Sequence, residues 1–436
     1  MRFDELRNET YQIQIRSLEV EVLKDWVILH SDCNCFYASV EMLHRPEFRH
    51  VPMAVGGDPE ARHGIVLTAN YHAKRYGVKT GMALWQARQL CPDIVFVPPR
   101  MDLYLRFSRM AHEIYADYTD LQEPFGIDES WLDVTESCSL MGDGYSIAKE
   151  INQRIREELG ITVSIGVSFN KIFAKLGSDY RKPDAITVFG REDYQTKVWK
   201  LPVEDLLYVG KSTHKKLQMM GIRTIGDLAR AEEEMICRRL GKMGSVLIAF
   251  AKGQDDTPVR KENTEAPIKS IGNSTTTPRD LEDDQDVKII IYTLAESVSA
   301  RLRENGFRCR TVEISIRDNE LYHFTRQKKV TNVTNITNEI ADAAFELFRK
   351  NYNWERPVRS IGVRGCELVT DAYGEQMSLF LDYEYRQKQM KMDEAVDDIR
   401  RRFGYYSIQR GLMYYDQALS NQNPKEEHVV HPHSYF

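Results

Sequence analysis

The sequence contains no long apolar run and no pattern of paired cysteines. No segment approaches the roughly 18 consecutive apolar residues of a membrane-spanning helix, so we expect no membrane partner. Residues 1–25 mix acidic and basic side chains without an apolar core, which excludes a secretory signal. The seven cysteines are odd in number and scattered, unlike those of a disulfide scaffold. These absences predict a protein of the reducing cytoplasm.

The chain also lacks an excess of positive charge. Its 59 Lys and Arg residues against 65 Asp and Glu give a formal net charge of −6, which at face value argues against a nucleic-acid partner. The acidic excess lies in residues 26–190 and at the two ends, however, whereas residues 191–268 and 269–370 are weakly positive. The charge distribution therefore permits a nucleic-acid partner and predicts modest contact with its phosphates.

What the chain does have is the composition of an ordinary globular protein, with 42% hydrophobic and 28% charged residues. Strand and helix patterns alternate over residues 26–190, which predicts an α+β core. Short helices separated by glycines follow, and a second α+β domain spans residues 269–370. The remaining tail is polar apart from a helix expected over residues 392–403, and residues 1–25 and 404–436 indicate only flexible or helical extensions.

Three acidic residues stand where carboxylates can converge on a metal ion. Asp32 ends an apolar strand pattern, and Asp128 and Glu129 lie in the turn of an apolar hairpin. Neighbours in a turn can face the same side, whereas neighbours in a strand cannot. Mg²⁺ prefers oxygen ligands held on rigid elements. A single acid of this kind is most often a solvated turn residue, so the surrounding sequence has to decide.

The surrounding phrases resemble the two metal-binding motifs of the Y-family (translesion) DNA polymerases. They read SDCNCFYASVE at residues 31–41 and GIDESWLD at residues 126–133. Further matches follow in the order of that family, namely TANYHAK at 68–74 with Gly77, and SIGVS at 164–168 with Asn170, Lys171, Ala174 and Lys175. The resemblance covers residues 26 to about 368 and is nearest to the bacterial polymerase IV-like branch.

The resemblance implies an α+β right-hand polymerase with palm, fingers, a helical thumb and a separate α+β little-finger domain. The corresponding segments are an N-terminal extension (1–25), palm (26–36 and 101–190), fingers (37–100), thumb (191–258), linker (259–268), little finger (269–370) and C-terminal tail (371–436). We expect a monomer that binds primer-template DNA and dNTPs.

The implied chemistry is template-directed nucleotidyl transfer with two Mg²⁺ ions. Asp32, Asp128 and Glu129 are the implied catalytic and metal-binding residues, with the Cys33 backbone carbonyl as a further ligand. One ion would lower the pKa of the primer 3′-hydroxyl, and the other would clamp the triphosphate. The Cys33-x-Cys35 pair does not have zinc spacing.

Further residues match positions that hold the nucleotide. Tyr37 matches the steric gate against ribonucleotides, and Leu67 matches the fingers position over the nascent base pair, where it would restrict bulky lesions. Tyr71, Lys74 and Lys175 match the triphosphate contacts, although the family usually has Arg at position 74. Asn34 replaces an acid that is common in the polymerase IV-like branch, so we leave it out of the metal set.

Sequence-independent DNA contacts are expected from the thumb and the little finger. Residues 201–221 resemble a helix-hairpin-helix, with a first helix over 201–208 and a phosphate-binding hairpin at Gly210 and Lys211, although Ser212 replaces its second glycine. Lys269 begins the little finger, and Arg326 is expected on a basic sheet face. The basic residues assigned to its strands are Arg301, Arg303, Arg308, Arg310, Arg317, Arg326, Lys328 and Lys329. A solvated sheet face is the alternative.

Residues 375–380 in the tail read EQMSLF and resemble the peptide that binds the bacterial sliding clamp. Gln376, Met377, Leu379 and Phe380 are the implied contacts. Tethering to the clamp would supply processivity without new DNA contacts.

The primary interpretation is a low-fidelity DNA polymerase for translesion synthesis, with no segment for proofreading. Two alternatives are a nucleotide cyclase with a palm-like core and a non-catalytic DNA-bound scaffold that recruits other factors to the clamp. The cyclase does not explain the steric-gate phrase, the thumb or the clamp peptide. The three intact carboxylates argue against the scaffold.

Overall fold

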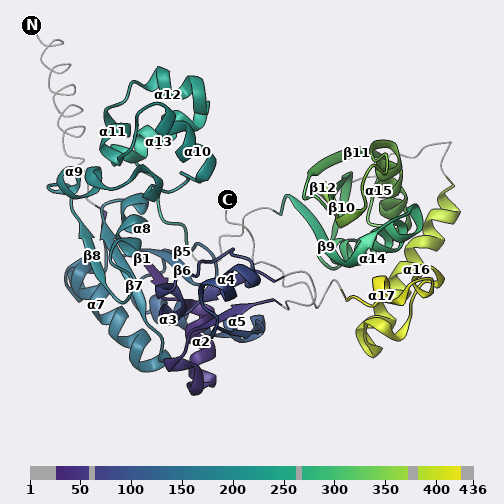
Figure 1. Cartoon of the computed structure of the whole chain (residues 1–436), viewed down its shortest axis with the longest axis horizontal. Helices are drawn as coiled ribbons and strands as arrows, with labels where there is room; N and C mark the ends of the chain where they lie inside the picture. Colours follow the sequence, from purple (N-terminus) through teal and green to yellow (C-terminus); the bar gives the residue numbers. More distant parts are fainter. Residues whose placement is uncertain (1–25, 58–63, 262–267, 372–381, 424–436) are drawn as a thin grey trace, which may run out of the picture. The chain divides into compact units, whose positions relative to one another are not determined.

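The computed structural model describes residues 26–57, 64–261, 268–371 and 382–423 (Figure 1). The first compact unit contains residues 26–57 and 65–261, and the second contains residues 268–371 and 382–423. Each unit mixes helices with a sheet, and the C-terminal unit has a sheet of its own, which confirms the predicted fold class. No helix in the described ranges is long and apolar enough to cross a membrane.

A five-stranded sheet forms the centre of the first unit. Its strands are, in spatial order, β5 (Gln122–Pro124), β6 (Glu129–Asp133), β1 (Ile28–Cys33), β7 (Val163–Ser168) and β8 (Ile186–Phe189). β1 pairs antiparallel with β6 and β7, and β7 pairs parallel with β8. Every residue of β1 is buried, as its apolar sequence predicts for a strand covered on both faces.

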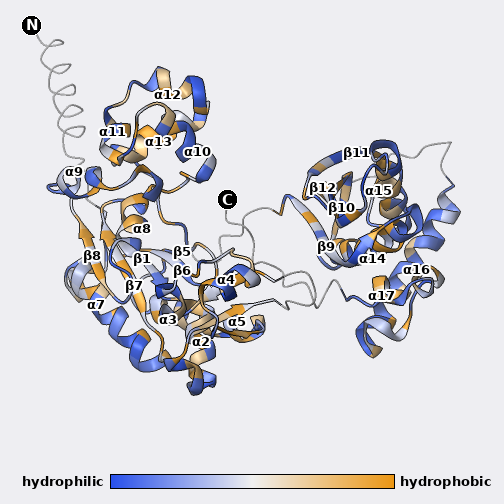
Figure 2. Cartoon of the chain, in the orientation of Figure 1, coloured by the Kyte–Doolittle hydropathy of each residue, from blue (hydrophilic) through white to orange (hydrophobic). Residues whose placement is uncertain are grey.

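The alternation of side chains along β1 decides which way Asp32 points. Leu29 lies in the core formed with α5 (Met101–Ala116) and α7 (Gly144–Arg154). Figure 2 shows the polar outer side of α7. His30 lies on the opposite face, where it contacts Ser178 of α8 (Lys171–Tyr180). Since side chains two residues apart share a face, Asp32 faces α8 as well.

Helix α8 lies directly against β7 at Gly166. A methyl group at Gly166 would come within 1.9 Å of the Ala174 carbonyl oxygen and 2.5 Å of the Ser178 nitrogen. Gly177 makes the matching close approach from the helix, since its Cβ would meet the Gly166 Cα at 3.0 Å. The absence of side chains at these two positions therefore sets how closely α8 approaches the sheet, and with it the end of the central strand β1 that carries Asp32.

A smaller sheet and short helices form the region expected to be the fingers. Its strands are β3 (Val66–Ala69), β2 (Met53–Gly56) and β4 (Val95–Val97), with β2 in the middle. The helices here are α2 (Phe36–His44), η1 (Pro46–His50), α3 (Tyr71–Arg75) and α4 (Leu84–Leu90). Elsewhere in this unit, α6 (Cys138–Met141) precedes α7, and η2 (Ile155–Leu159) continues it. The Asn70 side chain caps α3 by accepting from the Ala73 N–H at 3.0 Å, which orients the helix that carries Tyr71.

Short helices form the region expected to be the thumb. They are α9 (Tyr194–Lys197), η3 (Val198–Lys200), η4 (Val203–Asp205), α10 (Lys211–Met219), α11 (Ile225–Arg230), α12 (Glu233–Leu240) and α13 (Lys242–Ala251). The prediction of a helix over residues 201–208 was wrong, since that segment contains only the 3₁₀ turn η4. Pro202 and Leu206 have extended backbones, and Tyr208 has a φ of 70°, so helical hydrogen bonding cannot continue through them.

The second unit is a four-stranded antiparallel sheet with helices on one face. The strand order is β11 (His323–Thr334), β10 (Phe307–Asp318), β12 (Val358–Thr370) and β9 (Ser270–Leu281). Its core lies between this sheet and the helices α14 (Asp284–Glu304) and α15 (Thr337–Asn351).

The C-terminal segment packs onto this second unit. It contains α16 (Tyr383–Phe403), η5 (Tyr405–Ser407), η6 (Gly411–Tyr414) and α17 (Gln417–Ser420), and it buries Met413 and Leu419 in the core of the unit. Sequence analysis missed this structure beyond residue 403 because the segment is polar. Some of the polar residues of this C-terminal segment face a buried partner. The carboxylate of Glu296 on α14 pairs with Arg400 at 2.9 Å and with Arg410 at 2.7 Å.

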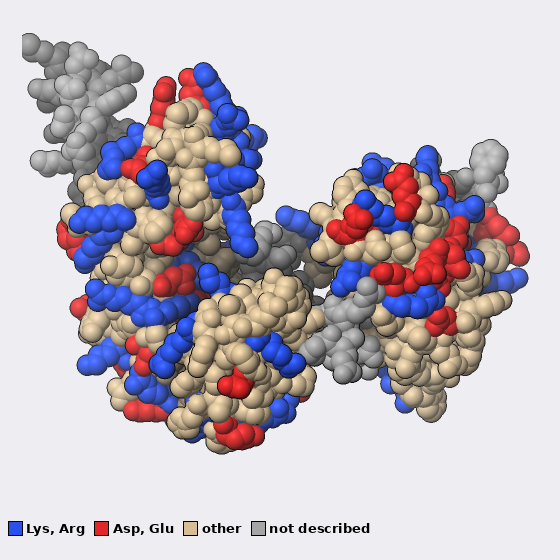
Figure 3. Space-filling model, viewed as in Figure 1, with Lys and Arg blue, Asp and Glu red and all other residues tan. Residues whose placement is uncertain are grey.

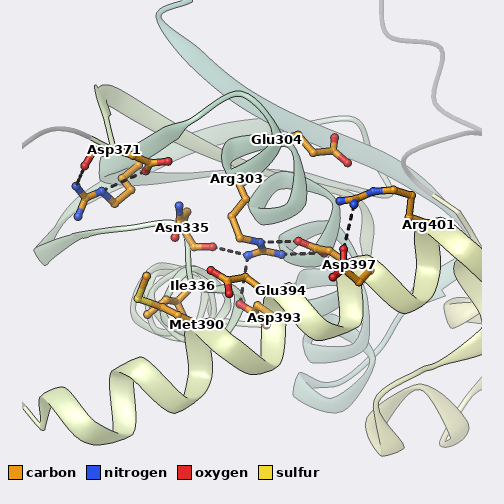
Figure 4. A pocket seen from close by; sticks show the side chains of 12 residues that line it. Arg303, Glu304, Asn335, Ile336, Asp371, Met390, Asp393, Glu394, Asp397 and Arg401 are labelled. Atoms are coloured by element: carbon orange, nitrogen blue, oxygen red, sulfur yellow. Dashed lines mark hydrogen bonds and ion pairs between the residues drawn. The ribbon is translucent and has the colours of Figure 1, made fainter.

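A cavity of about 550 Å³ lies where α16 meets α14 (Figure 4). Arg303 of α14 reaches across it to Asp397 at 2.6 Å and to Asp393 at 3.3 Å, and it donates to the Asn335 carbonyl. Arg303, Asp393 and Asp397 thus hold α16 to the domain across this cavity.

Candidate active site

The three acidic residues of the two motifs meet at one end of the central sheet. Asp32 on β1 and Glu129 on β6 are directly opposite each other in the antiparallel register. The backbone N–H of Cys33 donates to the carbonyl oxygen of Asp128 at 2.9 Å, which ties the turn before β6 to the end of β1. Two segments almost 100 residues apart in the sequence therefore form one carboxylate cluster.

Two lysines from the α8 region lie among these carboxylates. Lys175 contacts Asp32 Oδ2 at 3.1 Å and also pairs with Glu129. Lys182, two residues beyond the end of α8, contacts Asp32 Oδ2 at 2.6 Å. Asp179 holds both ammonium groups, at 3.3 Å from Lys175 and 2.8 Å from Lys182.

The electrostatics of the cluster show a shortage of positive charge around Asp128. Burial, followed by the Asp32 and Glu129 carboxylates, raises the pKa of Asp128 to about 7. Burial disfavours the charged form of Lys175, but Asp32, Glu129 and Asp179 outweigh it and raise the pKa of the ammonium group. Both lysines thus stay charged. A further cation beside Asp128 would stabilise the ionised form of its carboxyl group.

The donor set fits a divalent cation that prefers oxygen ligands. Burial and the three acids raise the pKa of the Cys33 thiol well above its usual range, so the thiol is neutral in the metal-free protein, and the backbone carbonyl is the oxygen that this residue offers. Among the residues that the structure describes, no group of three His, Cys, Asp or Glu side chains is already arranged to hold a metal ion. The reason is visible in the contacts, because Lys175 bridges Asp32 and Glu129.

Tyr37 lies beside this cluster on the first turns of α2. Its ring stacks on the buried Tyr104, with centroids 4.4 Å apart and planes 8° apart. Burial and the Asp128 carboxylate raise the pKa of Tyr37 to about 12, so the phenol is neutral and close to the acids. Its neighbour Phe36 is buried in the core, as the sequence predicted. Leu67 is half-buried on β3 and packs against the same core.

Tyr71 and Lys74 lie on α3. The Tyr71 hydroxyl donates to Asn34 Oδ1 at 3.4 Å, and burial, followed by Cys35, raises the pKa of this phenol. The exposed Lys74 ammonium lies 5.0 Å from the centre of the Tyr71 ring. The structure therefore brings these two residues together, with Tyr71 tied to the palm motif.

The thumb residues lie at a helix start. Gly210 is the N-cap of α10 and Lys211 is its first residue, and no side chain caps the helix. A Cβ at Gly210 would meet nothing within 4 Å, and Gly210, Lys211 and Ser212 are exposed, so the helix begins at the surface of the unit. Figure 3 shows Lys and Arg side chains gathered over this part of the unit, around α10 and α12.

The little-finger residues are distributed differently from the prediction. Arg326 pairs in register with the buried Ile314, so it lies on the helix-covered face at the sheet edge. Lys328 shares that face and pairs with Glu346 of α15. Arg301 and Arg303 lie on α14 and not on a strand. Arg317, Lys329 and Arg364 are exposed basic side chains on the open face, while Lys269 is exposed just before β9.

The clamp-peptide residues Gln376, Met377, Leu379 and Phe380 lie outside the described residues. All seven cysteines are free thiols, in agreement with the predicted absence of disulfides.

Sequence analysis missed Lys182, Asp179 and His30. Lys175, Asp179 and Lys182 are spaced i, i+4 and i+7, and this pattern could have indicated one charged helix face. His30 is fully buried between Ser178, whose Oγ lies 2.9 Å from Nδ1, and Glu129, whose Oε2 lies 3.3 Å from Nε2. Its position two residues before Asp32 on the same strand face was the available signal.

Comparison with known proteins places the chain among close relatives. The impB/mucB/samB family matches residues 31–179, and the C-terminal domain of that family matches residues 268–379. A protein of Acetivibrio thermocellus named DNA polymerase IV is 54% identical over 394 residues, which cover 90% of this chain and 99% of the relative. DNA polymerase IV of Moorella thermoacetica is 40% identical over 392 residues, which cover 90% of this chain and 97% of the relative. Among solved structures, a chimeric Y-family DNA polymerase superimposes with a TM-score of 0.70 at 26% identity, over 79% of this chain and 99% of the other.

Proposed function

The chain belongs to the impB/mucB/samB family as a bacterial Y-family DNA polymerase of the polymerase IV type, and on this premise we propose that it works by a two-metal mechanism centred on Asp32, Asp128 and Glu129. It is a DNA-directed DNA polymerase of translesion synthesis, and it binds primer-template DNA and dNTPs. The observation that carries the mechanism is the meeting of these three carboxylates at one sheet end.

Two Mg²⁺ ions would be held by the three carboxylates and the Cys33 carbonyl, where they would acidify the primer 3′-hydroxyl and neutralise the triphosphate. The protein's own part is to position and to balance charge. Lys175 and Lys182 are charged, and each is already shared between several acids. These ammonium groups can exchange a carboxylate for a phosphate oxygen when a nucleotide enters.

The remaining residues surround the nucleotide in this proposal. Tyr71 and Lys74 contact the triphosphate from α3, and the Tyr37 ring lies under the sugar and excludes a 2′-hydroxyl. The stack on Tyr104 supports this role because it prevents the Tyr37 ring from turning away. Leu67 covers the nascent base pair and restricts bulky lesions. If so, Leu67→Ala raises primer extension past a bulky template adduct, and unchanged bypass contradicts the role.

DNA is held without reading its sequence. The N–H groups at the exposed start of α10, together with Lys211, suit a backbone phosphate. In the little finger, the exposed Arg317 and Arg364 support an open sheet face as the DNA surface more strongly than Arg326 does. Lys269, just before β9, remains a candidate contact to the DNA backbone.

Processivity is proposed to come from the sliding clamp through residues 376–380, with the polymerase acting as a monomer and without proofreading. The alternative of a non-catalytic scaffold is disfavoured by the paired register of Asp32 and Glu129 and by the charged lysines beside them.

Primer extension on undamaged and damaged templates tests the proposal. We expect the wild type to incorporate dNTPs in the presence of Mg²⁺ and Asp128→Ala to lose this activity. Asp120→Ala is the matched control, because Asp120 is an exposed acid of the same unit and its ion-pair partner is the exposed Lys261. No incorporation by the wild type, or full activity of Asp128→Ala, overturns the mechanism.

A further inference from the structure

Asn34 joins the palm to the fingers at the nucleotide site. Its side chain is 2% exposed and lies between the carboxylate Asp32 and the gate residue Tyr37 in the sequence. Its Oδ1 accepts from Ser164 Oγ at 2.9 Å, on the palm strand β7, and from the Tyr71 hydroxyl at 3.4 Å, on the fingers helix α3. One buried oxygen is thus the acceptor for both parts of the unit.

The orientation of this amide is set by its other contacts. Asn34 Nδ2 donates to Thr162 Oγ1 at 3.2 Å. The Asn34 backbone N–H donates to the Thr162 carbonyl at 2.9 Å, and its carbonyl accepts from Ser39 Oγ at 2.6 Å. Because the nitrogen side of the amide is engaged by the palm, the oxygen side faces Tyr71, whose neutral phenol has one hydrogen to donate.

We propose that Asn34 is a positioning residue that holds the Tyr71 hydroxyl in place for the triphosphate of the incoming nucleotide. This inference rests on the proposed function and adds a residue that the metal and nucleotide sets leave out. An amide suits the position because it can donate to Thr162 and accept from Tyr71 without charge. A carboxylate would accept from Tyr71 as well, but it would add a negative charge two residues from Asp32.

A positioning role predicts a specific kinetic pattern. Loss of one hydrogen bond of ordinary strength corresponds to about a fivefold change in an equilibrium constant, so Asn34→Ala should raise the KM for dNTP about fivefold. The value of kcat should change less than about twofold, since Asn34 does not touch the reacting atoms. Tyr71→Phe should raise KM to a similar extent.

A double-mutant cycle tests whether Asn34 acts through Tyr71. Steady-state primer extension is measured for the wild type, Asn34→Ala, Tyr71→Phe and the double variant. We expect the double variant to have the KM of either single variant. Ser164→Ala is the matched control, because it removes the other donor to Asn34 Oδ1 and leaves the Tyr71 hydrogen bond, so its KM should stay within about twofold of the wild type.

Several outcomes overturn the inference. They are an unchanged KM in Asn34→Ala, additive effects in the double variant, and a KM increase in Ser164→Ala equal to that in Asn34→Ala. If Asn34→Ala does not fold, the cycle is repeated with Asn34→Asp, which keeps an acceptor oxygen. In that background Tyr71→Phe should still raise KM, and its failure to do so overturns the inference. No extension by the wild type, in contrast, overturns the proposed function and not the coupling.

Discussion

Lys182 Nζ lies 2.6 Å from Asp32 Oδ2 and 2.8 Å from Asp179 Oδ1, so one ammonium group is shared between the buried acid of β1 and the last turn of α8. Asp32 and Asp179 raise the pKa of Lys182 against the effect of burial, which keeps the group charged. The same two acids also contact Lys175. The sheet end therefore holds acids and lysines in one network, as the proposed binding of metal ions and an anionic nucleotide requires.

Lys182→Met should weaken dNTP binding. A hydrogen bond between charged groups is worth about 1.5–3 kcal/mol, so the KM for dNTP should rise at least about tenfold in steady-state primer extension. Arg181→Met is the control, because Arg181 is the exposed neighbouring cation and lies over the Tyr180 ring. Equal KM values for Lys182→Met and the wild type would contradict a role for Lys182 at the triphosphate.

Tyr37→Ala should admit ribonucleotides. Without the ring, the 2′-hydroxyl meets no obstacle, and discrimination by a pocket against one small group is worth about 100-fold. The ratio of kcat/KM for dNTP to that for rNTP should fall by about this factor. Tyr37→Phe keeps the ring and its stack on Tyr104, so it should retain the ratio. Unchanged discrimination in Tyr37→Ala excludes the gate role.

The stability of the metal-free protein should fall as the pH rises from 5 to 8. The pKa of Asp128 is about 7 in the folded state against an ordinary value of 3.8, so the folded state binds more protons between these values. The free energy of unfolding therefore decreases as pH rises through this range and levels off above pH 7. Between pH 5 and pH 8 this shift corresponds to a change of at most about 3 kcal/mol.

Urea unfolding in the presence of a chelator at pH 5 and pH 8 measures this effect. Asp128→Asn removes the titrating group, so its stability should depend less on pH than that of the wild type. A wild type that is equally or more stable at pH 8, relative to Asp128→Asn, would refute the linkage.

Gly166→Ala should destabilise the first unit and displace α8. The new methyl group would meet the α8 backbone at 1.9 Å, and overpacking of this kind costs about 3 kcal/mol. The urea concentration at the unfolding midpoint and the rate of primer extension should both fall. The reason is that Lys175 lies on α8 and Lys182 follows its last residue closely. Gly210→Ala serves as the stability control, since its Cβ would meet nothing within 4 Å. Wild-type stability of Gly166→Ala would show that α8 can move away freely.

Deletion of residues 376–380 should abolish stimulation by the sliding clamp and spare basal primer extension. Tethering raises the local concentration of the primer end without changing the active site. Extension is measured with and without loaded clamp. Equal stimulation of the deletion variant would remove the peptide from the proposal.

Much of the catalytic sheet was predictable because its signals are local. The apolar run before Asp32 predicted the buried strand β1, and the hairpin pattern predicted β5 and β6 with Asp128 in the turn between them. The prediction that Glu129 also lies in this turn was wrong, because Glu129 is the first residue of β6 and pairs in register with Asp32. A period of two then determines that His30 and Asp32 share a face. The family motifs likewise occupy short, ordered segments, so their order could be read without coordinates.

The tertiary structure decided what depends on contacts between distant segments. Lys175 is 143 residues from Asp32 in the sequence, and only the close approach of α8 at Gly166 brings them together. Register decided the face of Arg326, because a shift of one residue along a strand exchanges its two faces. The C-terminal segment reads only as polar, yet its Arg400 and Arg410 neutralise the buried Glu296, and a composition cannot reveal a partner that lies about 100 residues away.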